Sequence, residues 1–139
     1  MDFNSFKVLY AEVMMNYQLL EYDIKYIYSF MREGNLDDNL FMVKNNTLGE
    51  MIKLLKELDH SEDYHFISAK DYALLDRLCT TRNHWSHKTF SNFMYEKGFL
   101  ESEEYKKECK KLQDDYKKIE NALDILEDVK IEYCSELPK

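Results

Sequence analysis

The chain has 139 residues, the length of one ordinary domain. Its 19 basic and 27 acidic side chains give a formal charge of −8. This charge argues against a protein that binds bulk DNA or an anionic membrane through its overall charge, but it allows a local basic patch. Hydrophobic residues make up 45%, enough for a core, whereas three glycines and one proline are too few for the many tight turns of a sandwich or barrel.

Two amphipathic helices are predicted in the first part of the chain. Apolar side chains at steps of three and four run from Phe6 to Met31 and predict a long helix that ends near Gly34. Asn35 or Asp37 can cap a second helix, in which Gly49 costs about 1 kcal/mol relative to alanine without ending it. The apolar face of this second helix is predicted to contain Leu40, Val43, Leu48, Met51, Leu54, Leu55 and Leu58.

Two further helices are predicted after a connection over residues 60–67. Ser68, with an acidic residue three positions later, resembles a capping box and begins a helix that we expect to run through Trp85 to near Phe93. Residues 95–101 form a predicted loop, and Ser102 is the predicted N-cap of a last helix whose Lys- and Glu-rich face we expect to be solvated. Four helices joined by short loops predict an all-α, up-and-down four-helix bundle that forms a single domain over residues 1–139.

One segment departs from the acidic composition of the chain. Between Arg77 and Tyr95 there is no acidic residue, although about one residue in five of the whole chain is acidic. The segment holds basic side chains and the only tryptophan, Trp85. A cationic surface on an acidic protein suits a phosphate-bearing ligand better than a long duplex. Chance absence of acids from one polar helix face is the alternative. The candidate RNA- or phosphate-binding side chains in this segment are Arg77, His84 and Lys88.

The same segment contains Arg82-Asn83 followed by His87, an arginine and a histidine separated by four residues. This pattern resembles the signature of the HEPN family, compact helical bundles with Arg, four to six residues, then His, often with Asn after the Arg. Arg77 and His84 also satisfy the looser spacing. The resemblance implies a two-fold homodimer that places two copies of the motif across a shared cleft.

The resemblance also implies a function, a metal-independent endoribonuclease that cleaves single-stranded RNA or tRNA without a cofactor. Such enzymes act as toxins of toxin–antitoxin pairs or as phage-defence effectors, and an antitoxin protein is then an expected partner. In HEPN toxins silenced by a nucleotidyltransferase, a tyrosine usually stands two positions after the histidine. Thr89 stands there in this chain, which argues against that form of control.

The residue types fit this chemistry. Histidine exchanges protons near neutral pH, so His87 can take the proton of a ribose 2′-OH. Arg82 carries a planar fork of donors that matches phosphate oxygens, and Asn83 can orient the histidine or hold a phosphate or sugar hydroxyl. On one continuous helix, however, Arg82 and His87 point about 140° apart, so a second chain or the end of the helix near His87 is needed to bring them together.

Structural interpretations compete with each of these roles. His87 can simply stabilise a helix C-terminus, and Arg82 can be an ion-pair partner of an acid on another helix. Trp85 is more typical of a core or interface anchor than of a base-stacking platform. His84 and His87 at i, i+3 offer at most a poor zinc site, because no acid lies near them in sequence.

Three functions therefore remain open on the sequence. The first is the HEPN-type ribonuclease, the second is a non-catalytic HEPN-like module that binds a nucleotide or a protein, and the third is a plain helical interaction domain. The three cysteines contain no CxxC pair and no apolar run reaches the length of a membrane span or a signal-peptide core, so we expect a reducing, cytoplasmic setting without membrane attachment.

Overall fold

In the computed structural model, the described residues 1–61, 65–91 and 93–134 are helical or irregular, with no β-strand among them. The all-α prediction is therefore confirmed. The helices are α1 (Phe3–Met31), α2 (Leu36–Val43), α3 (Leu48–Ser61), α4 (Ala69–His87) and α5 (Glu103–Val129), with a short 3-10 turn over Phe99–Glu101 before α5 and a π-helical turn over Lys130–Cys134 after it.

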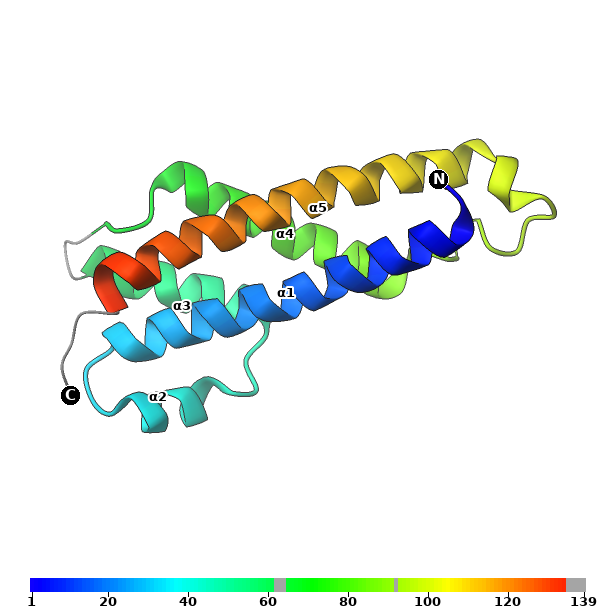
Figure 1. Cartoon of the computed structure of the whole chain (residues 1–139). Coiled ribbons are helices and arrows are strands. Elements are labelled where there is room, and N and C mark those ends of the chain that lie inside the picture. The colour runs from blue at the N-terminus through cyan, green and yellow to red at the C-terminus, as the bar shows by residue number, and fades with distance from the viewer. Residues whose placement is uncertain (62–64, 92, 135–139) are drawn as a thin grey trace.

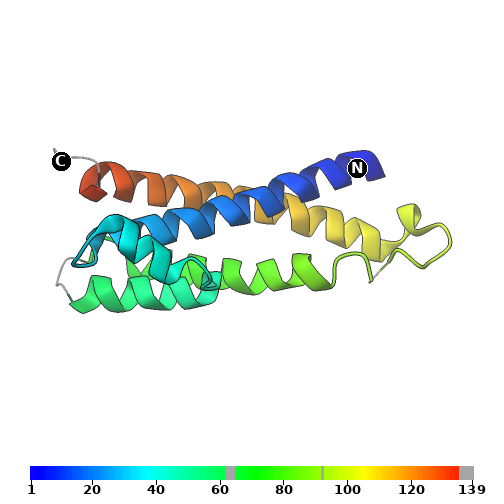
Figure 2. The ribbon, with the colours of Figure 1, turned by 90° about the horizontal axis from the view of Figure 1, so that it is seen from below.

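Successive helices reverse direction, so α1, α3 and α5 run one way and α2 and α4 run the other (Figure 1). The paired α1 and α5 form one layer and α3 and α4 form the second, with the short α2 beside α1 (Figure 2). The core lies between the layers, where one side of each long helix is buried. Its largest fully buried side chains include Trp85, Tyr17, Tyr72, Phe6 and Phe93.

Side-chain caps begin the helices where the sequence predicts them. The Asn35 side chain accepts the Asp38 N–H (3.2 Å), the Ser68 hydroxyl accepts the Asp71 N–H (3.1 Å), and Ser102 caps α5 in the same way (3.1 Å). Asn35, and not Asp37, is therefore the cap of α2. Gly34 has a φ of +112°, in the region that glycine tolerates, and allows the turn between α1 and α2.

The prediction of one helix over residues 36–58 is wrong, because the helix is interrupted after Val43 and a new helix begins at Leu48. Thr47 and Glu50 form a capping box: the Thr47 hydroxyl accepts the Glu50 N–H (3.2 Å) and Glu50 Oε1 accepts the Thr47 N–H (2.9 Å). Gly49 therefore lies in the first turn of α3, where it packs against α4. A Cβ at this position would lie 3.2 Å from the sulfur of Cys79. The break separates α2 from α3, which runs in the opposite direction, so the described residues form five α-helices in place of four.

Candidate functional site

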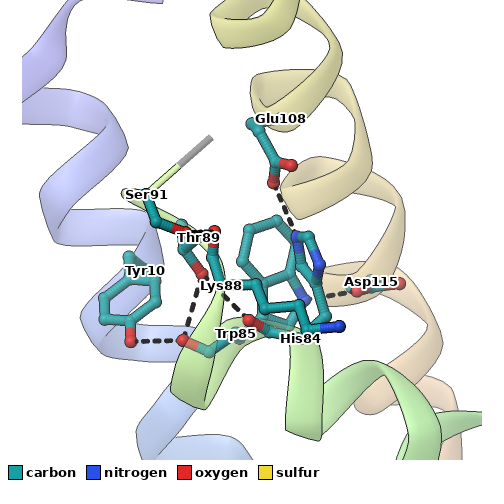
Figure 3. Close-up of polar contacts among 8 residues, drawn as sticks. All are labelled: Tyr10, His84, Trp85, Lys88, Thr89, Ser91, Glu108 and Asp115. Atoms are coloured by element: carbon teal, nitrogen blue, oxygen red, sulfur yellow. Dashed lines mark hydrogen bonds and ion pairs between the residues drawn. The ribbon is translucent and has the colours of Figure 1, made fainter. Parts of the chain in front are cut away.

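The helix that carries the motif, α4, ends at His87, about six residues before the predicted end near Phe93. Side chains satisfy its last carbonyl groups. The Tyr10 hydroxyl and the Thr89 hydroxyl both donate to the carbonyl oxygen of Trp85, at 2.7 and 3.0 Å (Figure 3). The Lys88 N–H donates to the carbonyl oxygen of His84 (2.8 Å). The two hydroxyls supply the Trp85 carbonyl with partners from outside the helix, and the Lys88 N–H makes the ordinary helical bond to His84, so these two carbonyl groups are satisfied where the helix stops.

One flank of this helix end is left uncovered by α3. Gly49 in the first turn of α3 packs against Cys79, and Asp59 near its last turn bonds to Tyr72, so α3 covers only the first half of α4. The last two turns of α4 extend past the start of α3 (Figure 2). The side chains of α4 beyond Cys79 that point toward this open side come from Arg82, Asn83 and Ser86. We call this surface the uncovered flank.

Arg82 is half-buried on the uncovered flank. Its guanidinium lies close enough to Tyr17 and Cys79 for its positive charge to lower the pKa of each, against burial, which raises both. Among the described residues Arg82 forms no ion pair and no hydrogen bond. The alternative that Arg82 is the ion-pair partner of an acid on another helix is therefore wrong for the described part of the chain.

Asn83 and His87 are both exposed and lie one turn apart on the outward side of α4. Because α4 is continuous through His87, the expected angle of about 140° between Arg82 and His87 is preserved in the fold. The two side chains therefore do not converge on one small target within a single chain. Asn83 lies between them and faces solvent together with His87.

His84 is held in a different way from His87. Its Nε2 lies 2.9 Å from Oε2 of Glu108 on α5, and only 17% of the His84 side chain is exposed (Figure 3). Arg77 and His84 lie on the same side of α4, about 20° apart, but six residues separate them, so they are about 10 Å apart along the axis. Arg77 and His84 thus share a face of α4, but Nε2 of His84 is already hydrogen-bonded to Glu108.

Trp85 is a core residue, as the structural interpretation predicted, and it is 1% exposed. Its indole N–H donates to Asp115 on α5 (Figure 3). Asp115 is also buried, and this burial raises the pKa of its carboxyl group, while the bond from Trp85 and the charges of Lys118 and Lys111 act in the opposite direction. Trp85 is therefore unavailable for stacking on a base or on a second chain.

Two acidic side chains of α5, Glu108 and Asp115, contact the segment that has no acids of its own. The same helix also brings lysines that the sequence analysis assigned to a solvated face. These lysines line the contact of α4 with α5 beside Arg77 and Thr81. Their recurrence at steps of three, four and seven residues was visible in the sequence, but only the packing shows that they face α4. They are Lys107, Lys110, Lys111 and Lys118.

Groups of three or more metal-ligating side chains are absent from the described residues. No helix in that part of the chain combines the length and apolar character that a membrane span requires. No protein-family model, curated protein or solved structure matches this chain. Any functional assignment therefore rests on the residues of the site.

Proposed function

We propose that this chain is a metal-independent endoribonuclease of the HEPN type, acting on single-stranded RNA or tRNA. The observation that supports this most directly is the uncovered flank. Arg82 stands there with no acidic partner among the described residues, next to the exposed Asn83 and one turn from the exposed His87. A cation without a counter-charge and a free imidazole are the two groups that RNA cleavage without a metal needs.

In this reaction the 2′-oxygen of a ribose attacks the adjacent phosphorus. Neutral His87 takes the proton from the 2′-OH, and the bond from phosphorus to the 5′-oxygen of the next nucleotide breaks. Protonated His87 then gives this proton to the departing 5′-oxygen, which leaves a 2′,3′-cyclic phosphate and a 5′-OH and returns His87 to its neutral form. Arg82 stabilises the charge that develops on the phosphate oxygens, and Asn83 positions the sugar or phosphate.

A homodimer is part of this proposal, because the 140° between Arg82 and His87 prevents them from meeting within one chain. A second copy of α4 placed against the uncovered flank would bring Arg82 of one chain toward His87 of the other. Two-fold pairing is the commonest form of oligomer. Trp85 and Phe90 do not serve as anchors for it, since Trp85 is buried and Phe90 packs on Phe6 and Tyr10 of its own chain.

Exposed apolar side chains at this end, Met94 and Tyr95, offer contact area next to the motif. The exposed apolar side chains of α1, Val8, Met15 and Leu19, point away from the core and therefore away from α4. Pairing through them would not join the two motifs. Sedimentation at micromolar concentration should show a dimer that Tyr95→Ala weakens more than Leu19→Ala, and a monomer alone would contradict the composite site.

The biological role as a toxin or phage-defence effector with an antitoxin partner belongs to the same proposal and follows from the HEPN resemblance. Thr89, at the position where silenced HEPN toxins carry a tyrosine, is 2% exposed and donates its hydroxyl to the end of α4. Its hydroxyl is therefore not available to a nucleotidyltransferase. We accordingly expect an antitoxin, where one exists, to act by binding and not by modifying this position.

The decisive experiment is incubation of the purified protein with total RNA in EDTA. We expect cleavage that His87→Ala lowers by about 10²–10⁴-fold. His60→Ala, which removes another exposed histidine at the far end of the bundle, is the matched control and should leave the rate unchanged. Cleavage that EDTA abolishes, or that His87→Ala leaves intact, would contradict the mechanism. Binding of RNA without cleavage by the unmodified protein would favour the non-catalytic module.

A further inference from the structure

A groove follows the contact of α4 with α5, on the side of α4 opposite Arg82. Two adjoining hollows form it, with volumes of about 320 and 250 Å³, and both are bordered by Thr81, Asp115 and Lys118. The first continues along α5 toward the end of α4. The second continues along α4 in the other direction as far as Arg77. The basic side chains of the groove are Arg77, Lys107, Lys110, Lys111 and Lys118, and we call it the lysine groove.

The lysine groove is positively charged on a protein with a net charge of −8. Five basic side chains face two acidic ones, Asp114 and Asp115, which gives 5 − 2 = +3 when all are ionised. One of the two acids, Asp115, is buried and already accepts the indole N–H of Trp85. The exposed charge of the groove is therefore almost entirely basic.

The basic side chains of the groove lack the ion-pair partners that other lysines of the chain have, although the ammonium of Lys111 lies over the ring of Trp85 (5.8 Å). Lys25 pairs with Glu21 at 3.1 Å, and Lys130 pairs with both Asp23 and Glu127 at 3.0 and 2.9 Å. Within the part of the chain that the structure describes, no groove lysine forms an ion pair, and neither does Arg77.

The groove lysines include like charges at neighbouring positions on one helix face. Lys107 lies three residues from Lys110 and four from Lys111, so like charges are neighbours on one helix face, each pair costing about 0.2–0.5 kcal/mol. Asp114 and Asp115 offset part of this repulsion, and the charges of Lys111 and Lys118 act on Asp115, but no groove lysine forms an ion pair among the described residues. An anionic ligand would relieve the remaining repulsion and would gain from the concentrated charge.

We propose that the lysine groove binds the sugar–phosphate backbone of single-stranded RNA, a proposal that deepens the ribonuclease function and rests on it for the identity of the nucleic acid. From Lys107 to Lys118 the groove extends about 16 Å, enough for a few successive phosphates. It follows the surface along the contact of α4 with α5, and its two hollows of about 320 and 250 Å³ can take phosphate groups of a single strand that lies along them. An acidic peptide would need backbone partners or apolar pockets, which this lining of lysines and aspartates does not offer.

The position of the groove gives it a role in the reaction. Around α4, the exposed His87 and Asn83 lie between the groove side, marked by Arg77 and His84, and the uncovered flank with Arg82. A strand that leaves the groove at Lys107 therefore reaches the end of α4 at His87. The groove holds the RNA and the motif cleaves it.

The test measures binding separately from cleavage. A fluorescent 12-nucleotide RNA with 2′-O-methyl riboses, which cannot be cleaved by attack of the 2′-oxygen, is titrated by anisotropy at several salt concentrations in EDTA. Substitution of Lys107, Lys111 and Lys118 by glutamate should weaken binding at least about tenfold and reduce the slope of log K against log salt by about 2, at about 0.7 per lost phosphate contact. The matched control substitutes three exposed lysines away from the groove, Lys53 and Lys56 on α3 and Lys70 in the first turn of α4, by glutamate. This control should change neither the affinity for the RNA nor the salt slope.

A second variant keeps the test valid if the triple substitution disturbs the Asp115 carboxyl. Lys107→Glu with Lys110→Glu leaves Lys111 and Lys118, whose charges act on Asp115, in place and should still weaken binding. Equal affinity of groove and control variants for the RNA would overturn the groove proposal while cleavage by the unmodified protein upheld the ribonuclease. Groove-dependent binding without any cleavage would overturn the ribonuclease alone. Equally tight, groove-dependent binding of poly-glutamate would overturn the RNA assignment in favour of an acidic protein partner.

Discussion

The two ends of the bundle differ in whether charged groups are left without an ion-pair partner. At the end where α3 leads into α4, Asp59 is fully buried and accepts three hydrogen bonds, from the N–H groups of Phe66 (2.9 Å) and Ile67 (3.3 Å) and from the hydroxyl of Tyr72 (2.8 Å). At the motif end, Arg82 and the groove lysines have no ion-pair partner among the described residues.

The same contrast is present along α5. Residues 103–118, beside the motif, carry six lysines and five acids, whereas residues 119–132, in the rest of α5 and the turn after it, carry five acids and a single lysine, Lys130. That lysine is held by Asp23 and Glu127. Charges that are satisfied inside the fold contribute to its stability, whereas charges that are left unpaired are available to a ligand. The net charge of −8 therefore does not describe the surface around the motif, and the two ends should respond differently to substitution.

The largest expected effect is on catalysis at the motif end. Arg82→Ala should lower RNA cleavage by about 10²–10⁴-fold, the range for one essential catalytic group. Because Arg82 has no ion pair to lose among the described residues, the unfolding free energy should fall by less than about 1 kcal/mol. Arg82→Lys keeps the charge but loses the two-pronged fit to phosphate and should also be badly impaired. Cleavage assays and urea denaturation measure the two effects.

Arg32→Ala is the matched control, since Arg32 is also half-buried but lies beyond the end of α1, far from the motif. It should leave cleavage unchanged. The opposite pattern, an Arg82→Ala protein that unfolds readily while its folded fraction cleaves RNA normally, would assign Arg82 to structure.

The next effect in size is on stability at the opposite end. Asp59→Ala removes the acceptor of three buried or part-buried donors, each of which costs about 1–3 kcal/mol when left unsatisfied. We expect a loss of roughly 3 kcal/mol or more in urea denaturation, with cleavage per folded molecule unchanged. Glu57→Ala, an exposed carboxylate two residues earlier on α3, should change stability by less than about 0.5 kcal/mol. A catalytic defect in folded Asp59→Ala protein would show that the two ends are coupled.

Much of the fold could be predicted from local sequence patterns. The apolar steps of α1 and α5 and the caps Asn35, Ser68 and Ser102 depend only on neighbouring residues, and the structure confirms them. The break before α3 was also encoded locally, in the Thr47 and Glu50 capping box, but a continuous apolar pattern across it favoured one helix.

The remaining features depend on contacts between distant residues. The α4 helix ends at His87 because Tyr10, 75 residues before Trp85, donates to its last turn together with Thr89. The uncovered flank exists because α3 begins beside Cys79 and covers only the first half of α4. For the candidate site, the sequence indicated the motif residues, but not that His84 is engaged by Glu108. Nor could it show that the lysines of α5 face α4, because spacing alone does not define the partner of a helix face.

The smallest expected effect is the response of the buried Asp115 to pH. Burial raises the pKa of Asp115 above the 3.8 of an unburied aspartate, so the folded state holds this proton more tightly than the unfolded state does. The stability from this group is therefore fully present below about pH 3.8 and is lost as the pH rises through the raised value. Asp115→Asn still accepts the Trp85 N–H but cannot ionise, so it should be at least as stable as the unmodified protein at pH 7. That advantage should shrink as the pH falls through the raised pKa of Asp115, in melting temperatures measured from pH 7 to 4, whereas Asp114→Asn, at the exposed neighbour, should show no such trend. An advantage that grows toward acid would mean that Asp115 is stabilised as a carboxylate by Lys111 and Lys118, and the motif end would then resemble the Asp59 end in satisfying its charge internally.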